Sequence, residues 1–295
     1  MNQLLVLKRL ASHSLYYVLG SFLTRALAFL LLPLYTRLLS PVDYGILAVC
    51  AAVSVFFSML ATPPLAAAVS LFYFKYDPYE FRKLLGTVWL WLLFTPLLLL
   101  WGCEAWGPAL AQRYSPAVPW ACLRLALWVG YLTIAASLPI ALFSAEERPE
   151  LFVAFNLASF LATTAAIVYF VVFRHEGAIG SLRGQLAAAA ILAIASHVIV
   201  LRRASLRPVW RHLSASLALC TPFIPHSLSI KANDVADRLI LAHFRPLAEV
   251  GVYNLAYALG SIVLVFGSAF MTAYSPLYFK SSQDKDFLLR LPRIL

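Results

Sequence analysis

The sequence predicts an all-α polytopic membrane protein. Hydrophobic residues make up 62% of the 295 positions, charged residues only 12%, and the mean hydropathy is +0.82. A soluble domain of this composition would have too few polar side chains to cover its surface. The apolar runs have helical length and lack the ten-residue alternation of an outer-membrane barrel. Helices that satisfy their own backbone hydrogen bonds are therefore expected to cross the bilayer.

About eight transmembrane helices are expected, joined by short connections. The apolar runs place them at 14–38, 44–72, 83–103, 119–143, 151–173, 184–201, 214–243 and 249–279. The run after Lys8 and Arg9 is too long for a signal sequence, so it is interpreted as an uncleaved first span. Four cysteines lie in or beside apolar runs without metal-ligand spacing, which predicts packing residues and neither a metal site nor a cofactor.

The basic residues indicate how the helices are oriented. Of the 23 Lys and Arg residues, 14 lie at the N-terminus, after the second, fourth and sixth helices, or in the C-terminal tail, and six lie in the opposite connections. The positive-inside rule then places both termini in the cytoplasm. Because the net charge of +10 is concentrated at membrane edges, it does not indicate a nucleic-acid partner.

Two spans carry charges deep within the apolar run. Arg25 lies near the middle of the first, and the seventh carries Lys231, Asp234 and Arg238 on one helical face with Asn233 and Asp237 on its flank. A cation at that depth costs about 2.5–3.5 kcal/mol on insertion scales, so it usually faces protein, water or a ligand. One interpretation is a self-neutralised ladder from Lys231 through Asp234 to Arg238. The other is a hydrated cavity in which Arg25 and Lys231 receive an anionic headgroup.

Prolines interrupt several of the expected spans. They are Pro33, Pro63, Pro64, Pro96, Pro139, Pro222, Pro225 and Pro276. In a soluble helix each would cost about 3 kcal/mol or more, whereas membrane helices carry such kinks for packing and transporters use them to break helices at binding sites.

A short motif occurs twice at an offset of 206 residues. Asp43-Tyr44-Gly45 precedes one apolar run and Glu249-Val250-Gly251 precedes another. The same offset carries Arg25 onto Lys231. Since the spans six helices apart run in the same direction, the pattern indicates a parallel repeat in which each half contributes one cation near the midplane.

Three segments carry a resemblance to a known family. They are 34–49 (LYTRLLSPVDYGILAV), 231–257 (KANDVADRLILAHFRPLAEVGVYNLAY) and 273–279 (AYSPLYF). They resemble the polysaccharide transporter, Wzx-like family of lipid-linked oligosaccharide flippases in the MOP exporter superfamily, to which the MATE drug exporters also belong. The resemblance covers nearly the whole chain in helix spacing.

The resemblance implies two six-helix bundles around a cationic cavity that opens alternately to the two sides. Its cargo would be a polyprenyl-diphosphate-linked oligosaccharide held by Arg25 and Lys231, with Asp234, Asp237 and Arg238 in the same cavity. Kinks at Pro33, Pro222 and Pro225 would help the bundles rock. Gly45 and Gly251, with Asp43 and Glu249, would serve the turn and a close approach of consecutive helices. Membrane lipids and the polysaccharide polymerase with its chain-length machinery are the implied partners.

The chain departs from that family in length. Members usually have twelve to fourteen helices, so residues 1–212 would form a six-helix bundle and residues 213–295 a partial second bundle of two helices and a cytoplasmic tail. A C-terminally truncated protein is therefore expected.

Three other functions are weighed against a flippase. A membrane-embedded glycosyltransferase or polymerase would need a catalytic cluster, and neither 104–118 nor 202–213 offers an Asp-x-Asp site or a nucleophile with its base. A MATE-like ion-coupled exporter of cationic drugs would favour a negative cavity, whereas a diphosphate lipid favours a positive one. A structural scaffold is the third. His197 and His226 could couple transport to protons, although packing is the more common role of a lone histidine in a bundle.

Overall fold

A computed structural model of the protein describes residues 35–114 and 116–261, and every regular element within them is a helix. The elements are α2 (Pro41–Ala61), α3 (Leu65–Tyr73), α4 (Pro78–Tyr114), α5 (Trp120–Ile134), α6 (Ser137–Ala145), α7 (Pro149–Val168), the π-helix η1 (Tyr169–Phe173), α8 (Gly177–Leu201), α9 (Trp210–Cys220), the 3-10 helix η2 (Thr221–Phe223) and α10 (Ile224–Phe244). A further helix occupies residues 247–261.

Six helical segments in this described part are long and apolar enough to cross a membrane. They correspond to the second to seventh expected spans and confirm the prediction of a polytopic all-α membrane protein. Most of the first expected span and most of the eighth lie outside the described residues. The third span was expected at 83–103, but α4 has 37 residues, or about 55 Å at 1.5 Å per residue. Because a bilayer core is only about 30 Å thick, α4 must extend beyond it.

Three spans are divided by a break, and each break lies at proline. Residues 62–64, which include Pro63 and Pro64, separate α2 from α3. Residues 135–136 form a turn between α5 and α6, because Pro139 has no N–H to donate to the carbonyl four residues earlier. The chain passes from α9 through η2, which contains Pro222, into α10, which has Pro225 in its first turn. The backbone thus departs from α-helix at Pro222, and the kinks expected at Pro222 and Pro225 stay predictions.

Proline alone does not predict where a span breaks. Pro96 is fully buried inside α4, and Pro108 also lies within that uninterrupted helix. Membrane helices tolerate such prolines where neighbouring groups satisfy the freed carbonyl. The segment 104–118, expected to be an extramembrane connection, is consequently helical as far as Tyr114.

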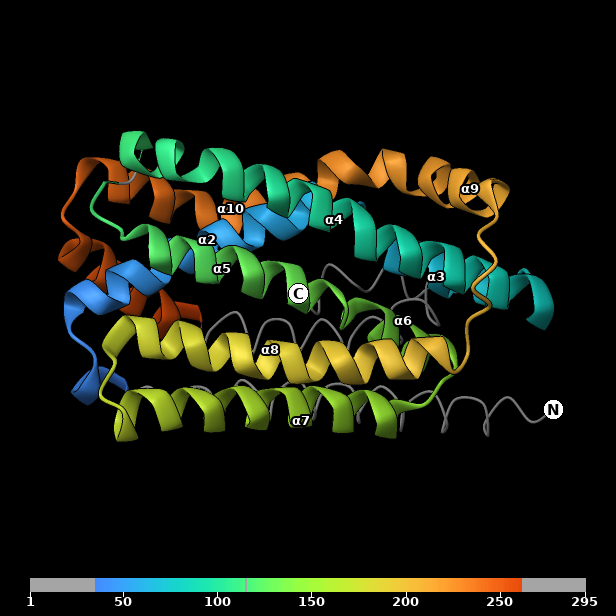
Figure 1. Ribbon diagram of the computed structural model, residues 1–295, viewed down its shortest axis with the longest axis horizontal. Helices are drawn as coiled ribbons and strands as arrows, with labels where there is room; N and C mark the ends of the chain where they lie inside the picture. Colours follow the sequence, from blue (N-terminus) through green and yellow to red (C-terminus); the bar gives the residue numbers. More distant parts are fainter. Residues whose placement is uncertain (1–34, 115, 262–295) are drawn as a thin grey trace, which may run out of the picture.

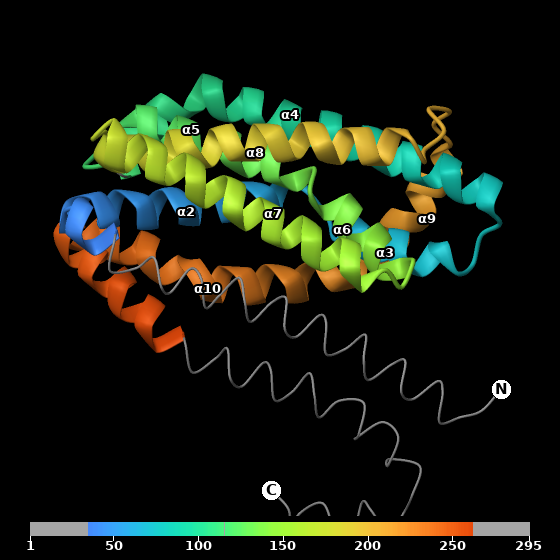
Figure 2. The ribbon, with the colours of Figure 1, turned by 90° about the horizontal axis from the view of Figure 1, so that it is seen from below.

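The helices lie roughly parallel and are packed in layers. In Figure 2, α2 lies between α10 on one side and α4, α5 and α8 on the other, and α2 packs against both α5 and α10. Figure 1 shows α7 and α8 side by side as an antiparallel pair. The connections after α3, α6 and α8 meet at one end of the molecule, and those after α4, α7 and α10 meet at the other. These two groups are the ones that the charge pattern assigned to opposite sides.

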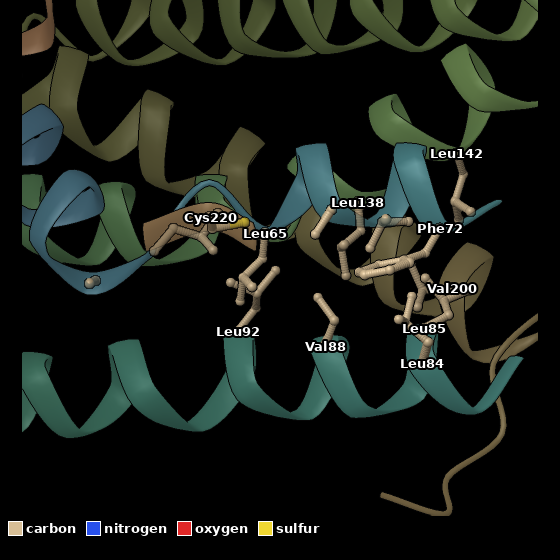
Figure 3. Close-up of a cluster of buried hydrophobic side chains, with 14 of the residues drawn as sticks. Leu65, Phe72, Leu84, Leu85, Val88, Leu92, Leu138, Leu142, Val200 and Cys220 are labelled. Carbon is tan, nitrogen blue, oxygen red and sulfur yellow. The ribbon is translucent and has the colours of Figure 1, made fainter. Parts of the chain in front are cut away.

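A cluster of buried hydrophobic side chains lies at the end of the molecule where α4 and α9 begin. Leu65 and Phe72 of α3 pack with Leu85 of α4, Leu138 of α6 and Val200 of α8 (Figure 3), and all five are at most 9% exposed. Within a bilayer such burial stabilises through van der Waals packing rather than through release of water. The cluster holds the short helices α3 and α6 in place beyond the breaks that precede them.

Candidate functional site

The three helix breaks surround a cavity of about 620 Å³, here called the central cavity. Its walls come from α2 and α3, from α5 and α6, from Leu92 of α4 and from the first turns of α10. Two of the breaks are tied together, because the Cys220 thiol donates to the Pro64 carbonyl oxygen at 3.3 Å; Figure 3 shows Cys220 beside Leu65. The volume falls within the range of about 300–1,000 Å³ that is typical of ligand sites.

Each broken helix contributes two polar residues to the wall at a spacing of four. The pairs are Ser58 and Thr62, Thr133 and Ser137, and Ser227 and Lys231. Ser227 and Lys231 lie one turn apart on the same face of α10, whereas Thr62 follows the end of α2 and Ser137 begins α6 beyond the break after Thr133. The six side chains form polar positions in an otherwise apolar wall. The cavity therefore combines five hydroxyl groups with one ammonium group.

Four of the hydroxyl groups donate their protons to backbone carbonyls, which leaves their oxygens free to act as acceptors. Ser58 donates to the Ser54 carbonyl at 2.7 Å, and Thr62 donates to the Ser58 carbonyl at 2.7 Å. Thr133 donates to the Val129 carbonyl of its own helix at 2.9 Å, and Ser137, the first residue of α6, donates across the break to the Ile134 carbonyl at the end of α5 at 2.7 Å. A hydroxyl that has used its only proton keeps its oxygen lone pairs as acceptors. A ligand rich in O–H groups would match these four positions.

The sequence analysis did not predict that these hydroxyl residues line a site, although a pattern in the sequence could have indicated them. In each broken span a Ser or Thr lies within two residues of a proline: Thr62 before Pro63, Ser137 before Pro139 and Ser227 after Pro225. In membrane helices Ser and Thr side chains can satisfy backbone groups that a proline frees, and irregular backbone is tolerated where it lines a cavity. Only the fold shows that the three breaks face the same space.

Lys231 supplies the only charge among the cavity-lining residues in the described part of the chain. It is exposed, and no carboxylate among the described residues lies within ion-pair distance of its Nζ. An uncompensated ammonium gives this wall a positive sign. The wall therefore suits an anion better than a cation.

Arg238 is directed away from the central cavity, toward the helix at 247–261. It is 8% exposed, its Nε donates to Asn254 Oδ1 at 2.9 Å, and its guanidinium lies 4.3 Å from the centre of the Tyr257 ring. Its carboxylate partner is Asp237, at 3.2 Å, while Asp234 offers only its backbone carbonyl. The Asp237 carboxylate also accepts from the Tyr253 hydroxyl at 2.5 Å.

The ladder interpretation expected Arg238 to pair with Asp234, and this part of it is wrong. The ion-pair partner of Arg238 is Asp237, which the helical spacing had assigned to the flank. The reason is the crossing helix at 247–261, which draws the guanidinium to Asn254 and Tyr257. Of the predicted cavity residues that are described, only Lys231 lines the central cavity. Arg25 and Pro33 lie outside the described residues.

The repeated motif lies at the crossing of α2 and the helix at 247–261. Asp43 completes a capping box: its carboxylate accepts from the Ser40 backbone N–H at 3.0 Å, and its own N–H donates to Ser40 Oγ at 3.1 Å. The second carboxylate oxygen accepts from the Ala178 N–H at 3.2 Å, where α8 begins. Glu249, its repeat counterpart, is exposed, and its ion-pair partner among the described residues is Arg245, at 3.9 Å.

Gly45 and Gly251 are needed where two backbones meet. A Cβ on Gly45 would lie 2.0 Å from the Leu247 carbonyl oxygen, and one on Gly251 would lie 2.0 Å from the Pro41 carbonyl oxygen. The close approach was expected between consecutive helices. It instead joins two helices that are far apart in sequence and that both carry the motif.

Neither histidine considered for proton coupling lines the central cavity. His197 accepts from the Trp89 indole N–H at 3.0 Å through Nδ1, with the two rings edge to face. This contact favours a packing role for His197. His226 is exposed in the first turn of α10.

The comparisons with known proteins identify one family. A family described as Polysaccharide biosynthesis protein matches residues 10–282, which is nearly the whole chain. No curated protein and no solved structure matches the chain.

Proposed function

We propose, since the chain belongs to the polysaccharide biosynthesis protein family, that it is a flippase that moves polyprenyl-diphosphate-linked oligosaccharides across the bacterial inner membrane. The family and the apolar helices make it a multi-pass membrane protein of polysaccharide biosynthesis and of transporter type. The finer proposal concerns the cargo and the mechanism. Surface polysaccharides such as O-antigen, capsule or exopolysaccharide would be the products that the cargo supplies.

One observation carries this proposal: Lys231 is the sole charged lining residue in the described part of the central cavity. A diphosphate carries negative charge and acceptor oxygens, and an ammonium group offers three donors to it. An exporter of cationic drugs would place a carboxylate there. Together with the four donating hydroxyls, which keep acceptor oxygens for sugar O–H groups, the wall matches both parts of a lipid-linked sugar.

The broken helices supply a means of alternating access. The α9–η2–α10 segment contributes Lys231 on one side of its break and packs against α3 and α4 on the other. A change at η2 would therefore alter the cavity wall and the packing of α9 together. Arg25 is proposed as the second cation from the 206-residue repeat, with both chain termini in the cytoplasm. The polymerase and chain-length machinery remain proposed partners.

The test is translocation of a labelled polyprenyl-diphosphate oligosaccharide by the protein in proteoliposomes. Lys231→Glu and Arg25→Glu should each abolish transport without reducing insertion. Lys231→Arg should retain part of it because the positive charge remains. Lys75→Glu is the matched control, since this exposed lysine lies in the connection after α3 and does not line the cavity. Full activity in Lys231→Glu, or efflux of a cationic dye that Lys231→Glu improves, would contradict the proposal.

A further inference from the structure

A second hollow lies outside the central cavity and shares no lining residue with it. This α4/α9 groove has a volume of about 430 Å³ and runs between α4 and the start of α9. Its walls are mainly apolar and include Leu90, Trp91, Phe94, Pro208, Trp210 and Leu213. The groove is thus large enough for a ligand but has little for a polar one to bind.

The walls of the groove open to the outside of the bundle. Trp210 is 72% exposed and Phe94 56% exposed, and both belong to helical segments that can cross a membrane. Exposed aromatic side chains of membrane helices face lipid, and tryptophan prefers the boundary between acyl chains and headgroups. An acyl chain is therefore the natural occupant of the apolar part.

A cationic surface adjoins the end of the groove at which α9 begins. Arg207 and Arg211 flank Pro208 and Trp210 in the chain, and both are exposed. Among the described residues neither has a carboxylate within ion-pair distance, whereas Arg203 in the same connection pairs with Glu146 at 2.5 Å. Val209, the N-cap residue of α9, offers no side-chain capping bond to the first turn of that helix. Two uncompensated cations beside a lipid-facing groove complement an anionic headgroup.

The two walls of the groove are held in fixed register. Thr87, another lining residue, accepts the Val209 N–H at 3.0 Å, and His212 contacts Glu80 at 2.9 Å. The Arg82 carbonyl accepts from the Ser205 N–H at 2.8 Å. A lipid would therefore enter a preformed groove and would not have to order its walls.

We propose that the α4/α9 groove binds an anionic phospholipid of the adjoining leaflet, with an acyl chain along Leu90, Trp91 and Phe94 and its phosphate at Arg207 and Arg211. This site is independent of the proposed cargo and of the central cavity. Bound there, the lipid links α9 to α4 at the end of the molecule where both helices begin.

The test uses Trp210 as a reporter in bilayers that mix phosphatidylglycerol and phosphatidylcholine, one of which carries brominated acyl chains that quench tryptophan fluorescence. The difference between the parent and Trp210→Phe isolates the signal of Trp210. Each arginine should raise the affinity of the groove for phosphatidylglycerol relative to phosphatidylcholine by about fivefold, and this ratio is called the preference. Arg207→Gln with Arg211→Gln should bring the preference close to one, and Arg202→Gln, an exposed arginine of the same connection, should leave it unchanged.

A groove-filling variant separates a seated lipid from simple attraction to the basic connection. Thr95→Phe, or Leu90→Phe where the first does not reconstitute, should remove the preference while both arginines remain. Equal quenching of the parent by the two lipids would overturn the proposal. So would a preference that survives filling of the groove, since the phosphate would then bind without a chain in it.

Discussion

Gly45 and Gly251 lie against each other at the crossing of α2 with the helix at 247–261: a Cβ on Gly251 would stand 2.9 Å from the Gly45 amide nitrogen. The contact is reciprocal. Gly45 faces the carbonyl of residue 247 and Gly251 faces that of residue 41, and these pairs are related by the 206-residue offset of the repeated motif. Two repeats that pack on each other in this way bring equivalent positions into contact, as in a two-fold symmetric interface.

The first prediction concerns this crossing. Gly251→Ala should destabilise the protein by more than the roughly 1–3 kcal/mol of ordinary overpacking, because the added methyl meets backbone that cannot turn aside. Gly45→Ala should do the same. Gly260→Ala is the control in the same helix, since nothing lies within 4 Å of its Cβ position. Thermal unfolding in detergent checks this. Equal stability of Gly251→Ala and Gly260→Ala would contradict it.

A second prediction concerns Asp43, whose carboxylate serves the first turns of α2 and α8 together. Asp43→Ala should cost about 1–2 kcal/mol, within the range for a lost N-cap partner. It should also speed amide exchange at Ala178. Glu249→Ala, at the equivalent repeat position, should cost less than about 0.5 kcal/mol, since its contact with Arg245 is exposed and 3.9 Å long. Unfolding together with hydrogen exchange measures both effects, and equal losses would refute the cap.

A third prediction separates the roles of Lys231 and Arg238. Lys231→Gln should weaken binding of the diphosphate lipid by about tenfold or more and leave thermal stability nearly unchanged, because this ammonium is exposed in the cavity wall. Lipid binding by native mass spectrometry and unfolding in detergent give the two readouts.

Arg238→Gln should show the opposite pattern, with binding retained per folded molecule and stability lowered by about 2 kcal/mol. The loss is less than the roughly 3–5 kcal/mol of a fully buried pair, because the Asp237 side chain remains 30% exposed. If both variants lost binding alone, Arg238 would belong to the cavity after all.

A fourth prediction concerns the contact of His212 with Glu80, which joins α9 to α4 at 2.9 Å. Glu80→Ala leaves the buried His212 ring without its partner, so the amides of residues 205–213 should exchange about tenfold faster. Glu150→Ala, an exposed carboxylate in the first turn of α7, is the control and should change nothing there. Unchanged exchange in Glu80→Ala would show that the backbone contacts alone hold the segment.

The sequence by itself determined the membrane class, the six spans of the described part and the offset that relates the two motifs. It could do so because a bilayer permits few solutions: a spanning chain must satisfy its backbone internally, and about twenty apolar residues are needed to cross. The Asp-x-Gly and Glu-x-Gly motifs were visible for a similar reason, since a helix start and a close backbone approach restrict residue type locally.

Only the tertiary structure decided which residues share a site. Helical spacing placed Lys231 and Arg238 on one face, but the neighbour that each side chain meets depends on α2, α5 and the helix at 247–261, which are distant in sequence. Likewise the helices break near the prolines at 63–64 and 139, whereas α4 continues through Pro96, a difference that the residue type alone did not predict. The spacing of residues along one helix determines the direction in which each side chain leaves the helix, and the packing between helices determines which residue or cavity it meets there.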